Sequence, residues 1–348
     1  MSSRRRLLTL GATALAAPAL LRIPRAQAQE VTLRLHHFLP AVSNVHCFFL
    51  QPWAQKVAAE SNNRLRIQIF PSMQLGGAPQ QLYDQARDGV ADITWTLPGT
   101  TPGRFPRIEV FELPFVAHQR AIVNCMAVQE FAAKNLQEEF REVHPLCIWA
   151  HGEGLIHSRR EVRTMEDLAG LKLRFPSRLN GEALRALGAA PIGMPVPQVP
   201  EALSQGVIDG AVVPWEVVPA IRLHELVRNH TEIPGSPTLY TTSFILAMNK
   251  ARYAALPDDL RRVIDANSGM AAAEMAAKPW DEQGPVVEQM VRRRGNQIIA
   301  ITEAEKQRWV QATQPVIDAW LAQNRDRGFD AAVLLAEARA LVAKNGAV

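Results

Sequence analysis

The sequence of 348 residues is poor in cysteine, with three, and in aromatic residues, which make up 6% of the chain. Cys47, Cys125 and Cys147 are isolated, and none belongs to a C-x-x-C or Cys/His spacing of the kind that zinc sites use. An odd number also excludes complete pairing within the chain. Two alternatives remain: a Cys125–Cys147 disulfide with one free thiol, or three buried thiols that act as small hydrophobic residues.

An excess of basic charge is also missing from most of the chain. The formal net charge of +4 comes from residues 1–28, which contain five of the 38 bases and none of the 34 acids. Residues 29–348 therefore carry 33 bases, 34 acids and a net charge of −1. Since this balance gives no electrostatic attraction to phosphates, we expect no nucleic-acid partner.

No run of 18 apolar residues follows residue 28, so we expect no insertion of the mature chain into a membrane. Residues 1–28 have the features of an export signal: arginines at 4–6, an apolar stretch from Leu7 to Leu21, and an A-x-A cleavage site ending at Ala28. The arginines resemble a twin-arginine signal, although its usual phenylalanine is absent. We predict cleavage after Ala28 and a periplasmic location.

The first part of the mature chain alternates between two hydrophobic periods. Apolar residues recur every second position at 31–35, 65–70 and 92–97, and with helical spacing at 45–61 and 79–88. This β-α-β-α-β order is typical of a doubly wound parallel sheet. After a strand at 146–150, we expect the chain to cross to a second lobe.

The rest of the chain repeats the alternation. Strands are expected at 156–158, 172–175, 210–213 and 298–301, and a strand from Tyr240 to Asn249 returns to the first lobe. A long Ala-rich helix is expected from Leu256 to Val291, kinked or split at Pro279. The 320 mature residues favour two domains. We therefore predict an α/β fold in which residues 29–150 and 240–279 form lobe I, while residues 151–239 and 280–348, with the C-terminal helices, form lobe II.

The strongest candidate for a ligand-binding side chain is Arg174. It is near the end of the predicted strand Lys172–Phe175, and Ser177 is a plausible N-cap of the helix that follows. In α/β sheets, ligands bind at such strand ends, beside helix N-termini that favour anions. An arginine there can bind a carboxylate through two parallel hydrogen bonds, although the same pattern fits a solvated surface arginine.

Several spaced motifs resemble one transport family. They are RLRIQIFPSMQLG at 64–76, FELPF at 111–115, EDLAGLKLRFP at 166–176 and ALGAAPIGMPVPQVPEALSQGVIDG at 186–210. In this order they resemble the DctP-like substrate-binding proteins of TRAP (tripartite ATP-independent periplasmic) transporters. The resemblance implies a two-lobed periplasmic-binding-protein fold with crossing strands and a long inter-lobe helix. It also implies an organic-acid ligand, a membrane permease as partner, no enzymatic activity and no cofactor.

The resemblance further implies that Arg174 holds the ligand carboxylate. Relatives that bind sialic acid carry a second arginine in a G-x-R turn, where this chain has Gly152-Glu-Gly154. Trp95, Phe38 and the segment Val213-Pro-Trp215 replace further polar positions of those relatives by apolar surface. We therefore expect a monocarboxylate with an apolar or aromatic body. The three aromatic residues fit equally well as plain core residues.

Loop histidines and Glu216 are further candidates for contact with the ligand. Loop histidines such as His37 donate hydrogen bonds to anionic ligands or face water, and Glu216 either holds a cation that bridges ligand and protein or is a surface carboxylate. A secreted hydrolase is a remote alternative, since the histidines have no H-E-x-x-H spacing and no G-x-S-x-G elbow occurs. The predicted ligand-binding set, with no catalytic or metal-binding residue, is Arg174, Trp95, Phe38, Trp215, His37, Ser177, Val213, Gly154 and Glu216.

Two other functions remain open at this point. A C4-dicarboxylate or a 2-oxo or 2-hydroxy acid is the alternative ligand, although a second carboxylate would have no evident partner. A periplasmic sensing module that reports to a receptor kinase would use the same carboxylate-binding arginine.

Overall fold

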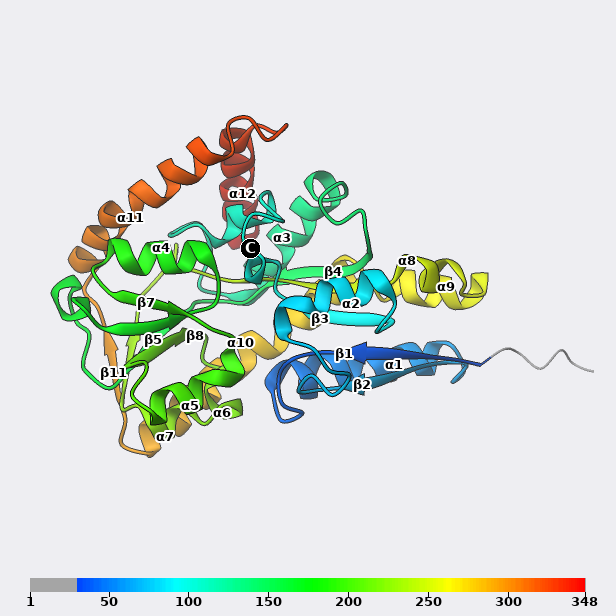
Figure 1. Cartoon of the computed structure of the whole chain (residues 1–348), viewed down its shortest axis with the longest axis horizontal. Coiled ribbons are helices and arrows are strands. Elements are labelled where there is room, and N and C mark those ends of the chain that lie inside the picture. The colour runs from blue at the N-terminus through cyan, green and yellow to red at the C-terminus, as the bar shows by residue number, and fades with distance from the viewer. Residues whose placement is uncertain (1–29, 348) are drawn as a thin grey trace, which may run out of the picture.

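The computed structural model describes residues 30–347, and the predicted export signal and its cleavage site lie outside the described residues. This part of the chain forms two mixed β-sheets side by side, with helices on their faces (Figure 1). The strand order is β2-β1-β3-β10-β4 in the first sheet and β11-β9-β5-β8-β6-β7 in the second. The predicted two-lobed α/β fold is confirmed.

The first sheet begins as the period-two pattern predicts. Its strands are β1 (Val31–His36), β2 (Leu65–Phe70), β3 (Ile93–Thr96), β4 (His144–Ala150) and β10 (Ser243–Met248). Strand β1 pairs in parallel with β2 and β3, and the returning strand β10 runs antiparallel between β3 and β4. Helices α1 (Gln51–Glu60) and α2 (Leu82–Asp88) make the two crossovers, and Gly89 ends α2 with φ 76°. A left-handed residue at this place is a usual helix stop.

The second sheet contains two strands that the sequence did not predict. Its strands are β5 (Leu155–Ser158), β6 (Lys172–Phe175), β7 (Ala190–Gly193), β8 (Gly210–Val213), β9 (Asn229–Glu232) and β11 (Gln297–Ala300). Strand β7, with the sequence APIG, is a short edge strand beside β6, and β9 reads NHTE without apolar alternation. Their pairing with neighbours decides their conformation, because neither has a strand pattern of its own.

The helices fill the space around both sheets. The remaining ones are α3 (Ala121–Asn135), α4 (Arg178–Ala186), α5 (Val199–Ser204), α6 (Val217–Ala220), α7 (Leu223–Leu226), α8 (Lys250–Ala254), α9 (Asp258–Ala266), α10 (Met270–Arg293), α11 (Glu303–Gln323) and α12 (Ala331–Gly346). In Figure 1, α10 runs from the first sheet toward the second, and it contacts both β4 and β11. It is the predicted long inter-lobe helix.

Of the expected kink or split at Pro279, the split is wrong. The helical segment is divided earlier, at Gly269, which has φ 62° and whose N–H donates to the carbonyl of Leu146 at 2.7 Å. From Met270 the helix continues through Pro279 to Arg293. A buried Ala-rich face holds it against α3 and β4, which outweighs the single backbone hydrogen bond that a proline removes.

The chain crosses between the sheets in the β4–β5 loop, in the β9–β10 segment and along α10. The strands of each sheet come from one of the two predicted lobes. Helix α11 packs on α4, whereas α12 packs on α3 and shares a hydrophobic cluster with the first sheet. The exact division of the chain into lobes stays a prediction.

All three cysteines lie in the described part and are free, so the alternative with a Cys125–Cys147 disulfide is not what the structure has. Cys125 and Cys147 are buried in the first lobe, and burial raises the pKa of both thiols. They act as small hydrophobic residues. No helix among residues 30–347 has the length and hydrophobicity needed to cross a membrane.

Candidate functional site

A cavity of about 400 Å³ lies between the two sheets, and both lobes contribute to its walls. The first lobe supplies Phe38, Trp95 and Phe244, and the second supplies Arg174, Ser177 and Val213. Five of the nine predicted ligand-binding residues thus line one cavity: Arg174, Trp95, Phe38, Ser177 and Val213. The other four predicted residues lie outside its lining: His37, Gly154, Trp215 and Glu216.

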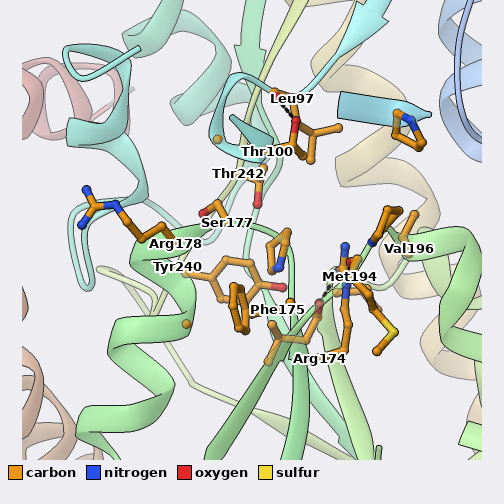
Figure 2. A pocket seen from close by; sticks show the side chains of 18 of the residues that line it. Leu97, Thr100, Arg174, Phe175, Ser177, Arg178, Met194, Val196, Tyr240 and Thr242 are labelled. Carbon is orange, nitrogen blue, oxygen red and sulfur yellow. Dashed lines mark hydrogen bonds between the residues drawn. The ribbon is translucent and has the colours of Figure 1, made fainter. Parts of the chain in front are cut away.

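Arg174 is the buried cation of this cavity. Strand β6 places it between β7 and β8, and 4% of the residue is exposed, which excludes the surface-arginine alternative. Its Nε donates to the carbonyl of Met194 at 2.8 Å and its Nη1 to that of Val212 at 3.2 Å. These two bonds hold the guanidinium in one orientation, with Met194 beside it in Figure 2.

The guanidinium of Arg174 lacks a counter-ion in the described part of the chain. No carboxylate among residues 30–347 forms an ion pair with it, and its Nη2 has no hydrogen-bond acceptor within that range. Burial lowers the pKa of Arg174 to about 10, so the side chain is still charged at neutral pH but is costly to keep charged without a partner. An anion with two oxygens would supply both the missing charge and the missing acceptors.

Two hydroxyl groups complete the polar end of the cavity. Figure 2 shows Tyr240 and Thr242 pointing toward the space that Arg174 borders. Both residues are 2% exposed, and neither hydroxyl has a hydrogen-bond partner within residues 30–347. Burial raises the pKa of Tyr240, so its hydroxyl stays protonated and can donate. Tyr240 and Thr242 were predicted only as part of the strand that returns to the first lobe and are absent from the predicted ligand-binding set.

Gly154 acts on the site through Tyr240. A Cβ atom at position 154 would overlap the Tyr240 ring, and the N–H of Gly154 donates to the Tyr240 carbonyl at 3.2 Å. The hydrogen bond ties the two backbones together, and the Tyr240 ring then leaves room for a hydrogen only on the Gly154 Cα. Gly154 is outside the cavity lining, and it makes room for a residue that is in the lining.

Aromatic rings form the apolar wall on the side of the first lobe. The ring centroids of Phe38 and Trp95 are 4.7 Å apart, those of Trp95 and Phe244 5.7 Å, and those of Phe244 and Trp280 5.5 Å. All four rings border the cavity. Such a wall packs well against a flat apolar body. Phe244 and Trp280 are not among the predicted site residues, because they border the cavity only when β10 and α10 pack together.

The structure places His37 behind this wall. His37 is fully buried, 5.5 Å from the Trp95 ring, and its Nε2 lies 2.8 Å from Nδ1 of His46. Burial and the neighbouring His46 lower the pKa of His37 to about 3, so the ring is neutral. It is not in the cavity lining. His36 is likewise bonded to Gln85 at 2.7 Å, so these histidines hold the loop after β1.

The structure places Trp215 and Glu216 in a neighbouring pocket of about 240 Å³, together with Glu153, Glu232 and Asp281. Trp215 Nε1 donates to Glu232 Oε1 at 3.2 Å. Glu216 is buried, and burial raises its pKa. Among residues 30–347 no cluster of His, Cys, Asp and Glu side chains has the arrangement of a metal site. Ligand contact by Trp215 and Glu216 stays a prediction without support from the cavity lining.

Glu112 is a buried carboxyl group directly behind the cavity. Its Oε1 accepts from the N–H of Ser243 at 3.0 Å, and a Cβ on the lining residue Gly99 would come within 2.7 Å of Oε2. Burial raises the pKa of Glu112 to about 7, against smaller opposing contributions from hydrogen bonds with Ser177 and Ser243. The protonated form is therefore the one that the folded state favours.

We expect Glu112→Gln to stabilise the protein at high pH. Below about pH 4.5 the carboxyl is protonated in both the folded and the unfolded state, whereas above about pH 7 the folded state holds a buried charge. The contribution of the wild-type carboxyl to stability is thus lost as the pH rises from about 4.5 to about 7. At pH 8 the variant should gain up to about 3 kcal/mol in unfolding free energy over the wild type, and almost nothing at pH 4. Denaturant titrations at both pH values measure this, and an equal difference at the two would contradict it.

Comparison with known proteins adds an independent finding. The sequence profile of DctP, described as bacterial extracellular solute-binding protein family 7, matches residues 35–324. A TRAP solute-binding protein from Rhodoferax ferrireducens, solved with copurified benzoate, is 45% identical to this chain. The match covers 91% of this chain and 99% of that one, with a TM-score of 0.88.

Two further solved structures are similar. A marine-metagenome TRAP solute-binding protein specific for aromatic acid ligands, solved with 3-hydroxybenzoate, is 42% identical with a TM-score of 0.89, over 91% of this chain and 99% of that one. A TRAP periplasmic solute-binding protein from Bordetella bronchiseptica, solved with (R)- and (S)-mandelate, is 28% identical with a TM-score of 0.83, over 90% of this chain and 99% of that one.

Proposed function

Since this chain belongs to family 7 of the bacterial extracellular solute-binding proteins, the DctP family, we propose that it is the receptor of a TRAP transporter for an aromatic monocarboxylate. The single observation that carries the ligand class is the buried guanidinium of Arg174, which has no counter-ion among the described residues and faces a wall of aromatic rings. One buried cation matches one carboxylate, and the rings match an aromatic body.

The solved relatives support this ligand class. The two structures at 42–45% identity contain benzoate and 3-hydroxybenzoate, and a third contains mandelate. Each of these ligands joins one carboxylate to one aromatic ring. The binding roles of Arg174, Trp95 and Phe38 in this chain are part of the proposal.

The other cations at the cavity argue against a dicarboxylate. Arg178 lines the cavity but already pairs with Glu109 at 2.9 Å and Glu182 at 2.8 Å. Arg185 also lines the cavity but is an exposed residue, so water solvates its guanidinium. A second ligand carboxylate that is desolvated without a partner would cost several kcal/mol.

In the cell, the receptor would be exported to the periplasm by the signal at residues 1–28 and would deliver the acid to the permease subunits of the transporter. The two lobes would close on the ligand through hinge motion in the β4–β5 loop and the segment at 240–242. Binding needs no cofactor or metal in this proposal, and the protein performs no catalysis on the acid.

A thermal-shift experiment on residues 29–348 tests the ligand class. Benzoate, at about a hundred times its dissociation constant, should stabilise the fold by about 2.7 kcal/mol and raise the midpoint by several degrees. Succinate should give no shift, and EDTA, calcium or sodium should not change the benzoate shift. A thermal shift with succinate but not with benzoate would contradict the proposal. If that succinate shift were lost in Arg185→Ala, Arg185 would be the cation that binds the second carboxylate. Nuclear magnetic resonance of recovered benzoate should show it unchanged.

A further inference from the structure

His151 lies in the cavity wall at the first residue after β4, and only 2% of it is exposed. Its ring packs edge-on against Tyr240, with centroids 5.5 Å apart, and stacks on Trp280 at 5.7 Å. Since these rings hold the imidazole plane from two sides, both ring nitrogens have fixed directions.

The contact at Nδ1 decides which nitrogen carries the proton. Nδ1 lies 2.9 Å from the carbonyl oxygen of Gly152. A carbonyl oxygen can only accept, so Nδ1 carries a hydrogen and donates it. Burial lowers the pKa of His151 to about 3, which leaves the ring neutral at physiological pH. Nε2 therefore has a free lone pair, and no donor among residues 30–347 is bonded to it.

This acceptor differs from the other unpaired polar groups in the cavity. Arg174 can only donate, and the unpartnered hydroxyl groups of Tyr240 and Thr242 can donate to a carboxylate. A carboxylate satisfies those groups but has no hydrogen for Nε2, and an aromatic C–H edge is at best a weak donor. A hydroxyl group on the ligand supplies the missing donor.

We propose that His151 is a specificity-determining residue that accepts a hydrogen bond from a hydroxyl group of the ligand, so that the protein selects hydroxylated aromatic monocarboxylates over unsubstituted ones. This inference rests on the proposed function, because Arg174 must first hold the carboxylate. The titratable side chain whose ring contacts His151 is Tyr240, which stays neutral and adds no charge beside the imidazole.

Isothermal titration calorimetry with benzoate and the three hydroxybenzoate isomers tests the inference. The ratio of the benzoate dissociation constant to that of the best isomer should be roughly three to ten in the wild type, the effect of one neutral hydrogen bond. In His151→Phe, which keeps an aromatic ring and removes the acceptor, this ratio should fall to roughly one. His151→Gln places an amide oxygen near the Nε2 position and should restore part of the ratio.

His151→Asn is the matched control for folding. Its amide can still donate to Gly152 from near the Nδ1 position but does not reach the Nε2 position, so its ratio should also fall to roughly one. A wild-type ratio of one or less, or an unchanged ratio in both the Phe and Asn variants, would overturn the inference. Failure of the proposed function is distinguishable, because then neither benzoate nor any isomer binds the wild type.

The pH dependence separates an acceptor from a cation at His151. The ratio of the benzoate affinity of the wild type to that of His151→Phe should be the same at pH 5.5 and pH 8, because the His151 ring is neutral at both and the Glu112 carboxyl behind the cavity titrates in both proteins. If affinity rises at pH 5.5 in the wild type but not in His151→Phe, a protonated His151 binds the carboxylate, and the inference is wrong.

Discussion

Replacing Arg174 with alanine is expected to weaken benzoate binding from roughly a hundredfold to several thousandfold. Removing one partner of a buried charge pair costs about 3–5 kcal/mol, and each 1.4 kcal/mol is a factor of ten in the dissociation constant. Arg174 is the buried cation of the lining, whereas Arg178 is already paired with Glu109 and Glu182 and Arg185 is exposed. We therefore expect neither of them to replace the positive charge that the ligand carboxylate loses. Calorimetric titration of the variant with benzoate measures the loss.

The folding of this variant needs a separate control, because Arg174 also donates to the carbonyls of Met194 and Val212. Alanine removes both hydrogen bonds but also removes a buried charge, and these effects on the empty protein oppose each other. Arg174→Lys keeps the charge without the planar fork and should still bind benzoate poorly. Lys172→Ala, on the exposed start of the same strand, should bind like the wild type. Wild-type affinity in Arg174→Ala would refute the carboxylate site.

The second large effect is expected for Gly154→Ala, which should both lower the free energy of unfolding and abolish most benzoate binding. The added Cβ would overlap the Tyr240 ring, and the hydrogen bond between the two backbones prevents them from moving apart. Overpacking of this kind costs about 1–3 kcal/mol. The displaced ring takes the Tyr240 hydroxyl away from Arg174. Denaturant unfolding and calorimetry measure the two losses.

A double-mutant cycle tests whether Tyr240 is the cause. In a Tyr240→Ala background, the cost of Gly154→Ala should shrink by most of its value, because the overlapping ring is gone. Gly284→Ala is the matched control: it lies inside α10 with no atom within 4 Å of its added Cβ, and it should be neutral or stabilising by up to about 1 kcal/mol. An equal cost of Gly154→Ala in both backgrounds would show that the strain lies elsewhere.

The parts of the site that the sequence predicted are those with a local signature. Arg174 lies near the end of β6, just before the N-terminus of α4, and α4 begins after the predicted N-cap Ser177. The predictions for Trp95 and Phe38 came instead from the resemblance to the DctP-like proteins, whose sialic-acid-binding members have polar residues at these positions. Strand and helix periods are written into the chain itself, so the place of Arg174 needed no knowledge of the partner lobe.

The parts that the sequence missed depend on how distant segments meet. Phe244, Trp280 and His151 belong to three elements far apart in the chain, and their rings border one cavity only because β10, α10 and the β4–β5 loop converge. Trp215 and His37 are as apolar or as buried as the lining residues but face other neighbours.

The sequence by itself determined the family, the α/β alternation and the arginine at the strand end, because each is encoded in a local pattern or in spaced motifs. Only the tertiary structure decided which buried residues face the cavity, where the helix before α10 breaks, that α12 packs on the first lobe, and which nitrogen of His151 is free. The physical reason is that burial and periodicity specify that a side chain points inward, whereas the packing of two sheets against each other specifies what it meets there.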